Sequence, residues 1–271
     1  MMQENSHQEE KELQELVKKF STMLRKGEHF FFDVDEYENL IDFYFSRNNI
    51  RMANKAIVCG IDQHPNSVIF MLRKAQILAT SNKIHKALEL LTQVESIDPQ
   101  NPELFMTKGA IFSKMNKPEK AIEEFLKTLS NYQDSDEVYL NIAFEYENLL
   151  DYHKALEYFL KALEINPSNE QALYESSYCF DHSGLNDKAI DFFTNFIDKY
   201  PYSIAAWYNL GIAYNLSGLF EKSVEAFDYA IAIDKNFTSA YFNKGTSLIC
   251  LEKYEEAIDV FNESAAIDST D

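Results

Sequence analysis

The stretch CFDHSG, residues 179–184, places a cysteine, an aspartate and a histidine close together. Cys179 and His182 have the side chains for nucleophilic catalysis, in which a histidine takes the thiol proton and the thiolate attacks. Side chains that are adjacent in sequence point in different directions on a helix, so these residues would not face one another. We therefore interpret Cys179, Asp181 and His182 as scattered polar positions and not as a catalytic site.

No other pattern predicts catalysis or cofactor binding. The chain contains no phosphate-binding loop, dinucleotide fingerprint, HExxH motif or EF-hand loop. Cys59, Cys179 and Cys250 lie far apart without metal-ligand spacing, and the histidines are isolated. We expect reduced, mostly buried cysteines in a cytoplasmic protein. The sequence thus predicts no enzyme activity, no cofactor and no metal site.

The composition restricts the kinds of partner. A formal net charge of −19 disfavours nucleic acid and anionic membrane, because both are negatively charged. The N-terminus has no signal-peptide pattern, and no apolar run is long enough to span a membrane. A neutral or basic protein partner is compatible with the acidity. The simpler interpretation, which we favour, is that the charge keeps a long helical surface in solution.

The elements that carry these residues repeat every 34 residues. Steps of 34 from Trp207 reach large apolar or aromatic residues at every copy: Tyr37, Met71, Phe105, Tyr139, Leu173 and Tyr241. The same steps from Ser223 reach Ala53, Ala87, Ala121, Ala155, Ala189 and Ala257. Within each copy, apolar residues follow helical spacing, break, and resume, so each copy predicts two helices. The small residues are expected where the two helices cross, because a close crossing leaves no room for a large side chain.

Turn residues mark the two breaks in each copy. Asn or Gly recurs at the first break, at Asn48, Asn82, Asn116, Gly184 and Gly218. Both residue types tolerate a left-handed backbone. Proline often closes the copy, at Pro65, Pro99, Pro167 and Pro201, because it cannot continue the preceding helix. The predicted units are 34–67, 68–101, 102–135, 136–169, 170–203, 204–237 and 238–271.

This arrangement resembles the tetratricopeptide repeat family. The resemblance rests on the pattern W-x2-L-G-x2-Y at Trp207, Leu210, Gly211 and Tyr214, and on Ala-x3-Phe-x2-Ala with a closing Pro at Ala155, Phe159, Ala162 and Pro167. It implies an all-α, right-handed solenoid of helix–turn–helix repeats. We expect residues 1–33 to comprise a disordered tail at 1–8 and a capping helix from Glu9 to Lys26, because a terminal repeat needs a cover.

The resemblance also implies a concave groove lined by the first helix of each unit, which would bind an extended peptide. Its predicted residues are Leu140, Asn141, Phe144, Tyr174, Glu175, Tyr178, Tyr208, Asn209, Ile212, Phe242 and Asn243. Asparagine can both donate to and accept from a peptide backbone, and the aromatic rings offer contact area with few rotors to immobilise. A rim of Glu137, Glu147, Glu175 and Asp181 would prefer basic side chains. The lysine–asparagine carboxylate clamp of the family's chaperone-tail binders does not occur here.

The predicted function is therefore a non-catalytic scaffold for a protein or peptide, neutral to basic, with aromatic or apolar anchors. Two alternatives remain open. The C-terminal unit, with Ile258 and Phe261 on α-helical apolar positions, could mediate structural self-association, giving a homodimer. The repeats could also be the substrate-recognition arm of a longer enzyme or regulator.

Overall fold

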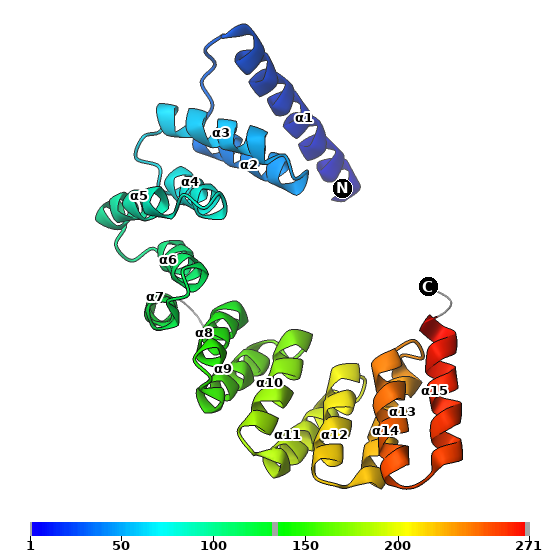
Figure 1. Ribbon diagram of the computed structural model, residues 1–271. Helices are drawn as coiled ribbons and strands as arrows, with labels where there is room; N and C mark the ends of the chain where they lie inside the picture. Colours follow the sequence, from blue (N-terminus) through cyan, green and yellow to red (C-terminus); the bar gives the residue numbers. More distant parts are fainter. Residues whose placement is uncertain (1, 132–134, 269–271) are drawn as a thin grey trace. The chain divides into compact units, whose positions relative to one another are not determined.

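The computed structural model describes the backbone of residues 2–131 and 135–268 and the side chains of residues 10–129 and 135–267. The described residues form α-helices joined by short turns, and no strand occurs among them. The chain divides into two compact parts, Met1–Asn116 and Lys117–Asp271. The helices, shown in Figure 1, are α1 (Met2–Lys26), α2 (Val34–Ser46), α3 (Ile50–Gln63), α4 (Val68–Thr80), α5 (Ile84–Ile97), α6 (Pro102–Lys114), α7 (Pro118–Asn131), α8 (Asp136–Asn148), α9 (Tyr152–Ile165), α10 (Glu170–His182), α11 (Asn186–Lys199), α12 (Ile204–Leu216), α13 (Phe220–Ile233), α14 (Thr238–Cys250) and α15 (Tyr254–Asp268).

From α2 onward the helices alternate between a first and a second helix of a pair. Every first helix begins at the first residue of a predicted unit, and every second helix begins 16 residues later. The turn between them always contains one residue with a positive φ, at Asn48, Asn82, Asn116, Leu150, Gly184, Gly218 and Glu252. Five of these are the Asn and Gly residues of the predicted turn. Leu150 and Glu252 adopt the same left-handed conformation without the residue type that favours it.

The capping helix α1 covers the first helix pair. Phe20 of α1 is fully buried, and its ring contacts Phe32, Tyr37 and Tyr44 at centroid distances of 6.0, 6.2 and 6.3 Å. The helix begins at Met2, before the predicted start at Glu9, so the backbone of residues 2–8 is helical where a disordered tail was expected. The apolar stripe starts only at Leu13, but glutamine and glutamate are good helix formers and extend the helix without it.

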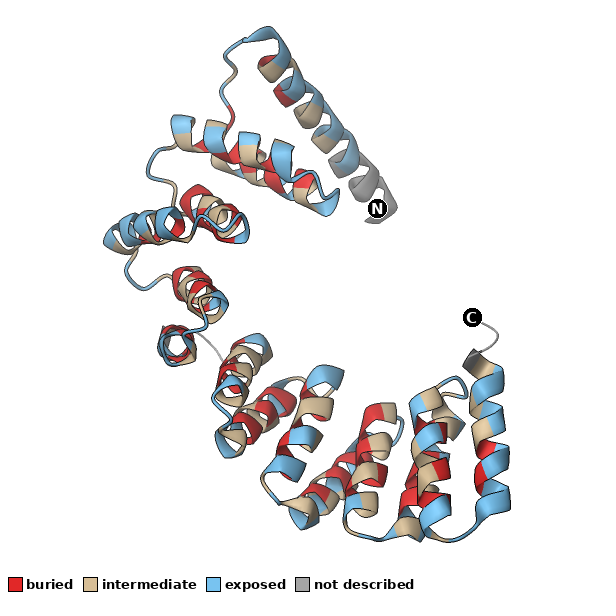
Figure 2. Cartoon of the chain, viewed as in Figure 1, coloured by how far each residue is buried: buried red, intermediate tan, exposed pale blue. Residues whose placement is uncertain are grey.

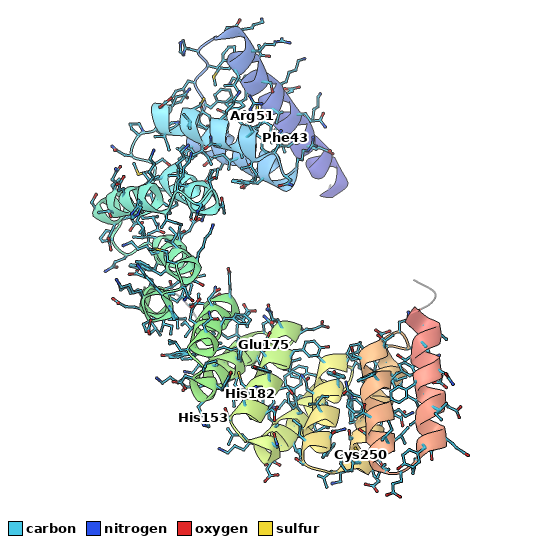
Figure 3. All side chains as sticks on the ribbon, viewed as in Figure 1. Phe43, Arg51, His153, Glu175, His182 and Cys250 are labelled. Carbon is cyan, nitrogen blue, oxygen red and sulfur yellow. The ribbon has the colours of Figure 1, made fainter. Side chains whose placement is uncertain are left out.

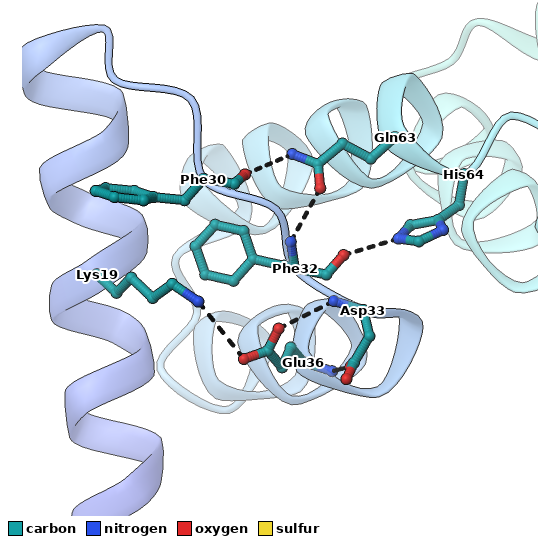
Figure 4. Close-up of polar contacts among 7 residues, drawn as sticks. All are labelled: Lys19, Phe30, Phe32, Asp33, Glu36, Gln63 and His64. Atoms are coloured by element: carbon teal, nitrogen blue, oxygen red, sulfur yellow. Dashed lines mark hydrogen bonds and ion pairs between the residues drawn. The ribbon is translucent and has the colours of Figure 1, made fainter.

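Side chains at the end of α3 hold the segment between α1 and α2 (Figure 4). The Gln63 amide donates to the carbonyl of Phe30 at 2.9 Å and accepts from the N–H of Phe32 at 3.0 Å. His64 Nε2 lies 2.8 Å from the carbonyl oxygen of Phe32. Asp33 then begins α2 with a capping box, in which its side chain and that of Glu36 each accept a backbone N–H of the other. The connection is therefore fixed by side chains that bond to its backbone.

In Lys117–Asp271 the core lies where the paired helices meet, as the buried residues in Figure 2 show. The predicted small residues Ala155, Ala189 and Ser223 are all buried at these crossings. Gly211 and Gly245 are tight positions on the first helices, because a Cβ built at either would lie 2.6 Å from a ring carbon, of Phe227 and Phe261 respectively. The prediction that small residues permit close helix approach is confirmed at these positions.

Trp207 packs as the repeat pattern predicts. Its indole N–H donates to the carbonyl of Pro201 at 2.9 Å, and its ring stacks on Tyr229 with centroids 4.3 Å apart. One repeat later, the Tyr241 hydroxyl makes the corresponding bond to the carbonyl of Lys235 at 3.2 Å. The large residue at this position therefore fastens the first helix to the turn that precedes it.

Candidate functional site

The cysteine and histidine of the CFDHSG stretch do not form a nucleophile pair. Cys179 is fully buried, and burial together with the charges of Glu147 and Glu175 raises the pKa of its thiol to about 12. His182 is exposed, and its Nδ1 lies 3.0 Å from the carbonyl oxygen of Tyr178. A thiol with so high a pKa stays protonated at neutral pH and is a poor nucleophile.

The predicted binding residues all lie on α8, α10, α12 and α14, within the part Lys117–Asp271. We call the surface that these four first helices present the first-helix face. The helix α10 contacts α12 directly, and α12 contacts α14, whereas each second helix packs mainly against the first helices that flank it. The first helices α10, α12 and α14 therefore form a continuous layer that can present side chains from three repeats to the same partner.

Tyr174, Tyr208 and Asn243 come together from three successive first helices. The rings of Tyr174 and Tyr208 meet edge to face with centroids 6.1 Å apart. Asn243 Nδ2 donates to the Tyr208 hydroxyl oxygen at 2.9 Å and to the carbonyl of Ser239 at 3.0 Å. Neither bond uses the side-chain oxygen of Asn243 or the hydroxyl proton of Tyr208. Burial raises the pKa of both tyrosines, so their hydroxyls keep their protons and remain hydrogen-bond donors.

The remaining predicted residues differ in how far they reach the surface. Phe242 is 61% exposed, and its ring lies against Phe261. Phe144 is partly buried against Phe159 at a centroid distance of 5.2 Å. The other partly buried members are Leu140, Asn141 and Ile212. These residues combine a packing role with a partly exposed surface.

Asn209 does not present the free amide that the sequence predicts. It is 2% exposed, and its amide donates to the carbonyl of Leu173 on α10 at 2.9 Å. The reason is the close contact of α10 with α12, which turns this side chain toward the neighbouring helix instead of toward solvent. Asn209 therefore ties two repeats together, and we leave it out of the binding surface.

A second group of side chains comes from α8 and α10. Glu147 and Glu175 are both partly buried, and desolvation raises the pKa of each carboxyl. The charge of Glu175 raises the pKa of Glu147 further, whereas His182 lowers it. Figure 3 marks Glu175 and His182 along α10.

Three rings from α9 and α10 contact one another: Tyr152, Tyr178 and His182. Tyr178 is 43% exposed. The centroid of its ring lies 3.9 Å from that of His182 and 5.8 Å from that of Tyr152. Sequence reasoning named Tyr178 and Glu175 but missed Tyr152, which begins a second helix. The sequence feature that could have identified Tyr152 is its place: it is an aromatic residue directly after the turn that follows a predicted groove helix.

The first helices of Met1–Asn116 present a surface of different character. Arg73 and Gln76 on α4 both bind Glu103 on α6, with Arg73 Nη1 3.4 Å and Gln76 Nε2 3.1 Å from the carboxylate. The side chains of Arg73, Gln76 and Glu103 are therefore already paired with one another. The aromatic groups of the predicted site belong to Lys117–Asp271.

A separate pocket of about 440 Å³ lies among the loops that precede α10 and α12. Its lining includes Pro167, Lys199, Tyr200, Pro201 and Tyr202, and none of the predicted binding residues contributes to it.

Among the described residues no cluster of three or more His, Cys, Asp or Glu side chains could hold a metal ion. None of the described helices combines the length and apolar character needed to cross a membrane.

Comparisons with known proteins give the family. Family models described as tetratricopeptide repeat match residues 137–169, 171–203, 204–237 and 238–271. The sequence has no significant match among curated proteins.

Solved structures with the same fold share little sequence with this chain. The protein MamA 41-end from Desulfovibrio magneticus RS-1 is 20% identical, with a TM-score of 0.51 over 62% of this chain and 96% of that one. YrrB, described as a TPR protein with an unusual peptide-binding site, is 22% identical, with a TM-score of 0.51 over 68% of this chain and 95% of that one. The C-terminal part of a TPR repeat-containing protein from Cytophaga hutchinsonii is 14% identical, with a TM-score of 0.57 over 73% of this chain and 80% of that one.

The repeated helix pairs and turns, the family matches and the shared fold lead to one assignment. This chain belongs to the tetratricopeptide repeat family.

Proposed function

We propose that the chain is a non-catalytic scaffold that binds an extended segment of a partner protein along the first-helix face of Lys117–Asp271. The observation that carries the proposal is the alignment of Tyr174, Tyr208, Asn243 and Phe242 across three neighbouring first helices. An extended peptide that crosses these helices would meet aromatic area and polar groups in turn. The tetratricopeptide repeat fold of YrrB, which has a peptide-binding site, supports the same function by analogy.

The polar groups of this surface suit a peptide backbone. The Tyr208 hydroxyl can donate its proton to a carbonyl, and the Asn243 side-chain oxygen can accept an N–H. Tyrosine and phenylalanine give large contact areas at a small entropic cost. The bound segment would therefore be held by its main chain and by one or two apolar or aromatic anchors.

A selection from a displayed library of random twelve-residue peptides on the full chain tests the proposal. We expect enriched peptides that carry aromatic or apolar residues, and we expect the Tyr174→Ala/Tyr208→Ala variant to bind them at least tenfold more weakly, since each side chain contributes to a partly buried contact. Tyr202→Ala is the matched control, because Tyr202 is a loop tyrosine that is 84% exposed. Equal binding by wild type and the double variant would contradict the site, and loss of binding in Tyr202→Ala would assign it to the loop pocket.

Self-association is the second candidate, and the apolar surface of α15 favours it. Tyr254 and Ile258 are one helical turn apart and are 58% and 59% exposed. Two such surfaces could cover one another in a dimer of two copies of this chain. Light scattering over a concentration series, with Ile258→Glu as the disrupting variant, would detect it. A constant monomer mass at all concentrations would exclude this candidate.

A further inference from the structure

A row of hydrogen-bonded polar groups joins α12, α13 and α14 in the interior. Asn215 Nδ2 donates to Ser247 Oγ at 2.7 Å, and the Oγ atoms of Ser247 and Ser223 lie 3.0 Å apart. Ser223 Oγ lies 2.8 Å from the carbonyl oxygen of Gly211, and both serines are fully buried. Each hydroxyl has one proton, so a single direction uses all these links, from the Asn215 amide through the two hydroxyls to the Gly211 carbonyl. We call Asn215, Ser223 and Ser247 the buried network.

The buried network departs from the apolar pattern of the other repeats. Ser223 stands where the other six units have alanine. Ala213 and Cys179 occupy the position of Ser247 in the two preceding units. The helix crossings therefore form without these polar groups elsewhere in the chain. Burying hydroxyls carries a desolvation cost that alanine avoids, whereas a fully bonded network fixes one geometry.

The buried network connects the same two helices that carry the Tyr208–Asn243 pair. Asn215 lies about two helical turns after Tyr208 on α12, and Ser247 lies about one turn after Asn243 on α14. The two helices are therefore linked twice, by one bond of 2.7 Å in the interior and one of 2.9 Å at the surface. Ser247 Oγ also lies 3.0 Å from the carbonyl oxygen of Asn243. A single link lets two helices rotate about it, whereas two links set both their spacing and their rotation.

We propose that the buried network positions the binding surface before a partner arrives. It holds the Tyr208 hydroxyl as a donor and the Asn243 side-chain oxygen as an acceptor at a fixed spacing. The inference rests on the proposed function, because it explains how that surface is preorganised. A pair that is already ordered loses little freedom on binding. Such a pair matches one C=O and one N–H of an extended main chain, so the bound segment must offer an unmodified N–H at this point.

An apolar variant tests this role, with the substitutions Asn215→Leu, Ser223→Ala and Ser247→Ala. Removing all the partners together leaves no buried polar group of the network unpaired, so we expect the free energy of unfolding to stay equal or to rise. Binding of an enriched peptide should nevertheless weaken about tenfold, because the surface is no longer preorganised. A purely structural role would lower stability and binding together. Chemical denaturation and peptide titration measure the two quantities.

Ser176→Ala is the matched control. Ser176 is a fully buried serine of the first helix α10, and its hydroxyl donates to the carbonyl of Leu173 in its own helix at 2.8 Å. The substitution removes a buried hydroxyl without removing a link between helices. We expect it to leave peptide binding unchanged.

A second measurement reads the Asn243 acceptor directly. The enriched peptide is prepared with one N-methyl group at each amide in turn. In wild type we expect the methyl group at one amide to weaken binding about tenfold, because it removes the N–H that Asn243 accepts. The same methyl group should weaken binding less than about threefold in Asn243→Ala and in the apolar variant, where that acceptor is absent or displaced.

The outcomes separate this inference from the proposed function. An apolar variant that binds as tightly as wild type and keeps the full N-methyl effect would overturn the positioning role and leave the proposed function intact. Equal losses of binding in the apolar variant and in Ser176→Ala would also overturn it. If the apolar variant does not fold, Ser247→Ala alone breaks the link between α12 and α14, and the same two measurements decide. Failure to enrich any peptide would overturn both proposals.

Discussion

Each turn within a repeat needs one residue with a left-handed backbone, and at Leu150 the residue type does not favour that conformation. Leu150 has a φ of 60° and is 70% exposed. A left-handed conformation costs a residue with a Cβ roughly 1–2 kcal/mol, and an exposed side chain recovers little of that by burial. The corresponding Gly184 has a φ of 66° and no such cost.

We expect Leu150→Gly to raise the free energy of unfolding by about 1 kcal/mol, because the strain disappears while little packing is lost. Chemical denaturation measures the change. Leu149→Gly is the control, since Leu149 has a helical φ of −83° and should lose stability on the same substitution. A decrease in both variants would show that the turn is not strained at Leu150.

Gly211 lies where α12 and α13 cross and has no room for a Cβ. A Cβ at this position would lie 2.6 Å from the Phe227 ring, which a real Cβ cannot do without a shift. The equivalent pair in α4 and α5 is Ala75 with Leu91, where a methyl group faces a smaller side chain.

We expect Gly211→Ala to lower the free energy of unfolding by about 1–3 kcal/mol through overpacking, although alanine is the better helix former. Adding Phe227→Leu to Gly211→Ala should restore part of the loss, because the pair then resembles Ala75 and Leu91. A double-mutant cycle from denaturation curves measures the coupling. Simple additivity of the two changes would contradict the steric explanation.

At the scale of elements, the connection from α1 to α2 depends on one amide. Gln63 holds the backbone of Phe30 and Phe32 by two hydrogen bonds, and the rings of Phe20 and Phe32 pack against each other. Both bonds go to backbone atoms. The Gln63 amide therefore holds the segment between α1 and α2 to the end of α3 whichever side chains that segment carries.

We expect Gln63→Leu to lower the stability of Met1–Asn116 by about 1–3 kcal/mol, because it leaves a partly buried carbonyl and N–H without their partner. Hydrogen exchange at the Phe32 amide should accelerate in this variant. The exposed Gln93→Leu is the control and should change neither quantity. Unchanged protection of Phe32 would show that the amide does not hold the segment.

The sequence predicted the elements better than the site. A 34-residue period reveals which positions recur, so the starts of all first helices and the packing of Trp207 could be deduced from spacing. The period does not show which way a side chain turns between repeats. Asn209 and Asn243 occupy the same repeat position, yet one binds a buried carbonyl and the other a tyrosine hydroxyl. That difference depends on how closely neighbouring helices approach, which composition does not encode.

For the molecule as a whole, the acidic composition bears on stability at Glu147 and Glu175. Both carboxyls have a pKa above the ordinary value of a glutamate in the folded chain. A raised pKa means that the folded state holds the proton more tightly than the unfolded state does. The stability that this provides is fully present below the unfolded pKa and is lost as pH rises through the folded pKa. At neutral pH the two charges therefore destabilise the fold.

We expect the Glu147→Gln/Glu175→Gln variant to unfold at a higher temperature than wild type at pH 7, because neutral amides remove the repulsion and the desolvated charges. The difference should shrink as pH falls through the raised pKa values, where the wild-type carboxyls become protonated, and should be smallest below pH about 4. Thermal unfolding by circular dichroism at several pH values measures it, with Glu164→Gln as the exposed control. Cys179, Tyr178 and His182 also interact electrostatically with Glu147. A variant that is less stable than wild type at pH 7 would instead mean that the two carboxylates serve the fold itself.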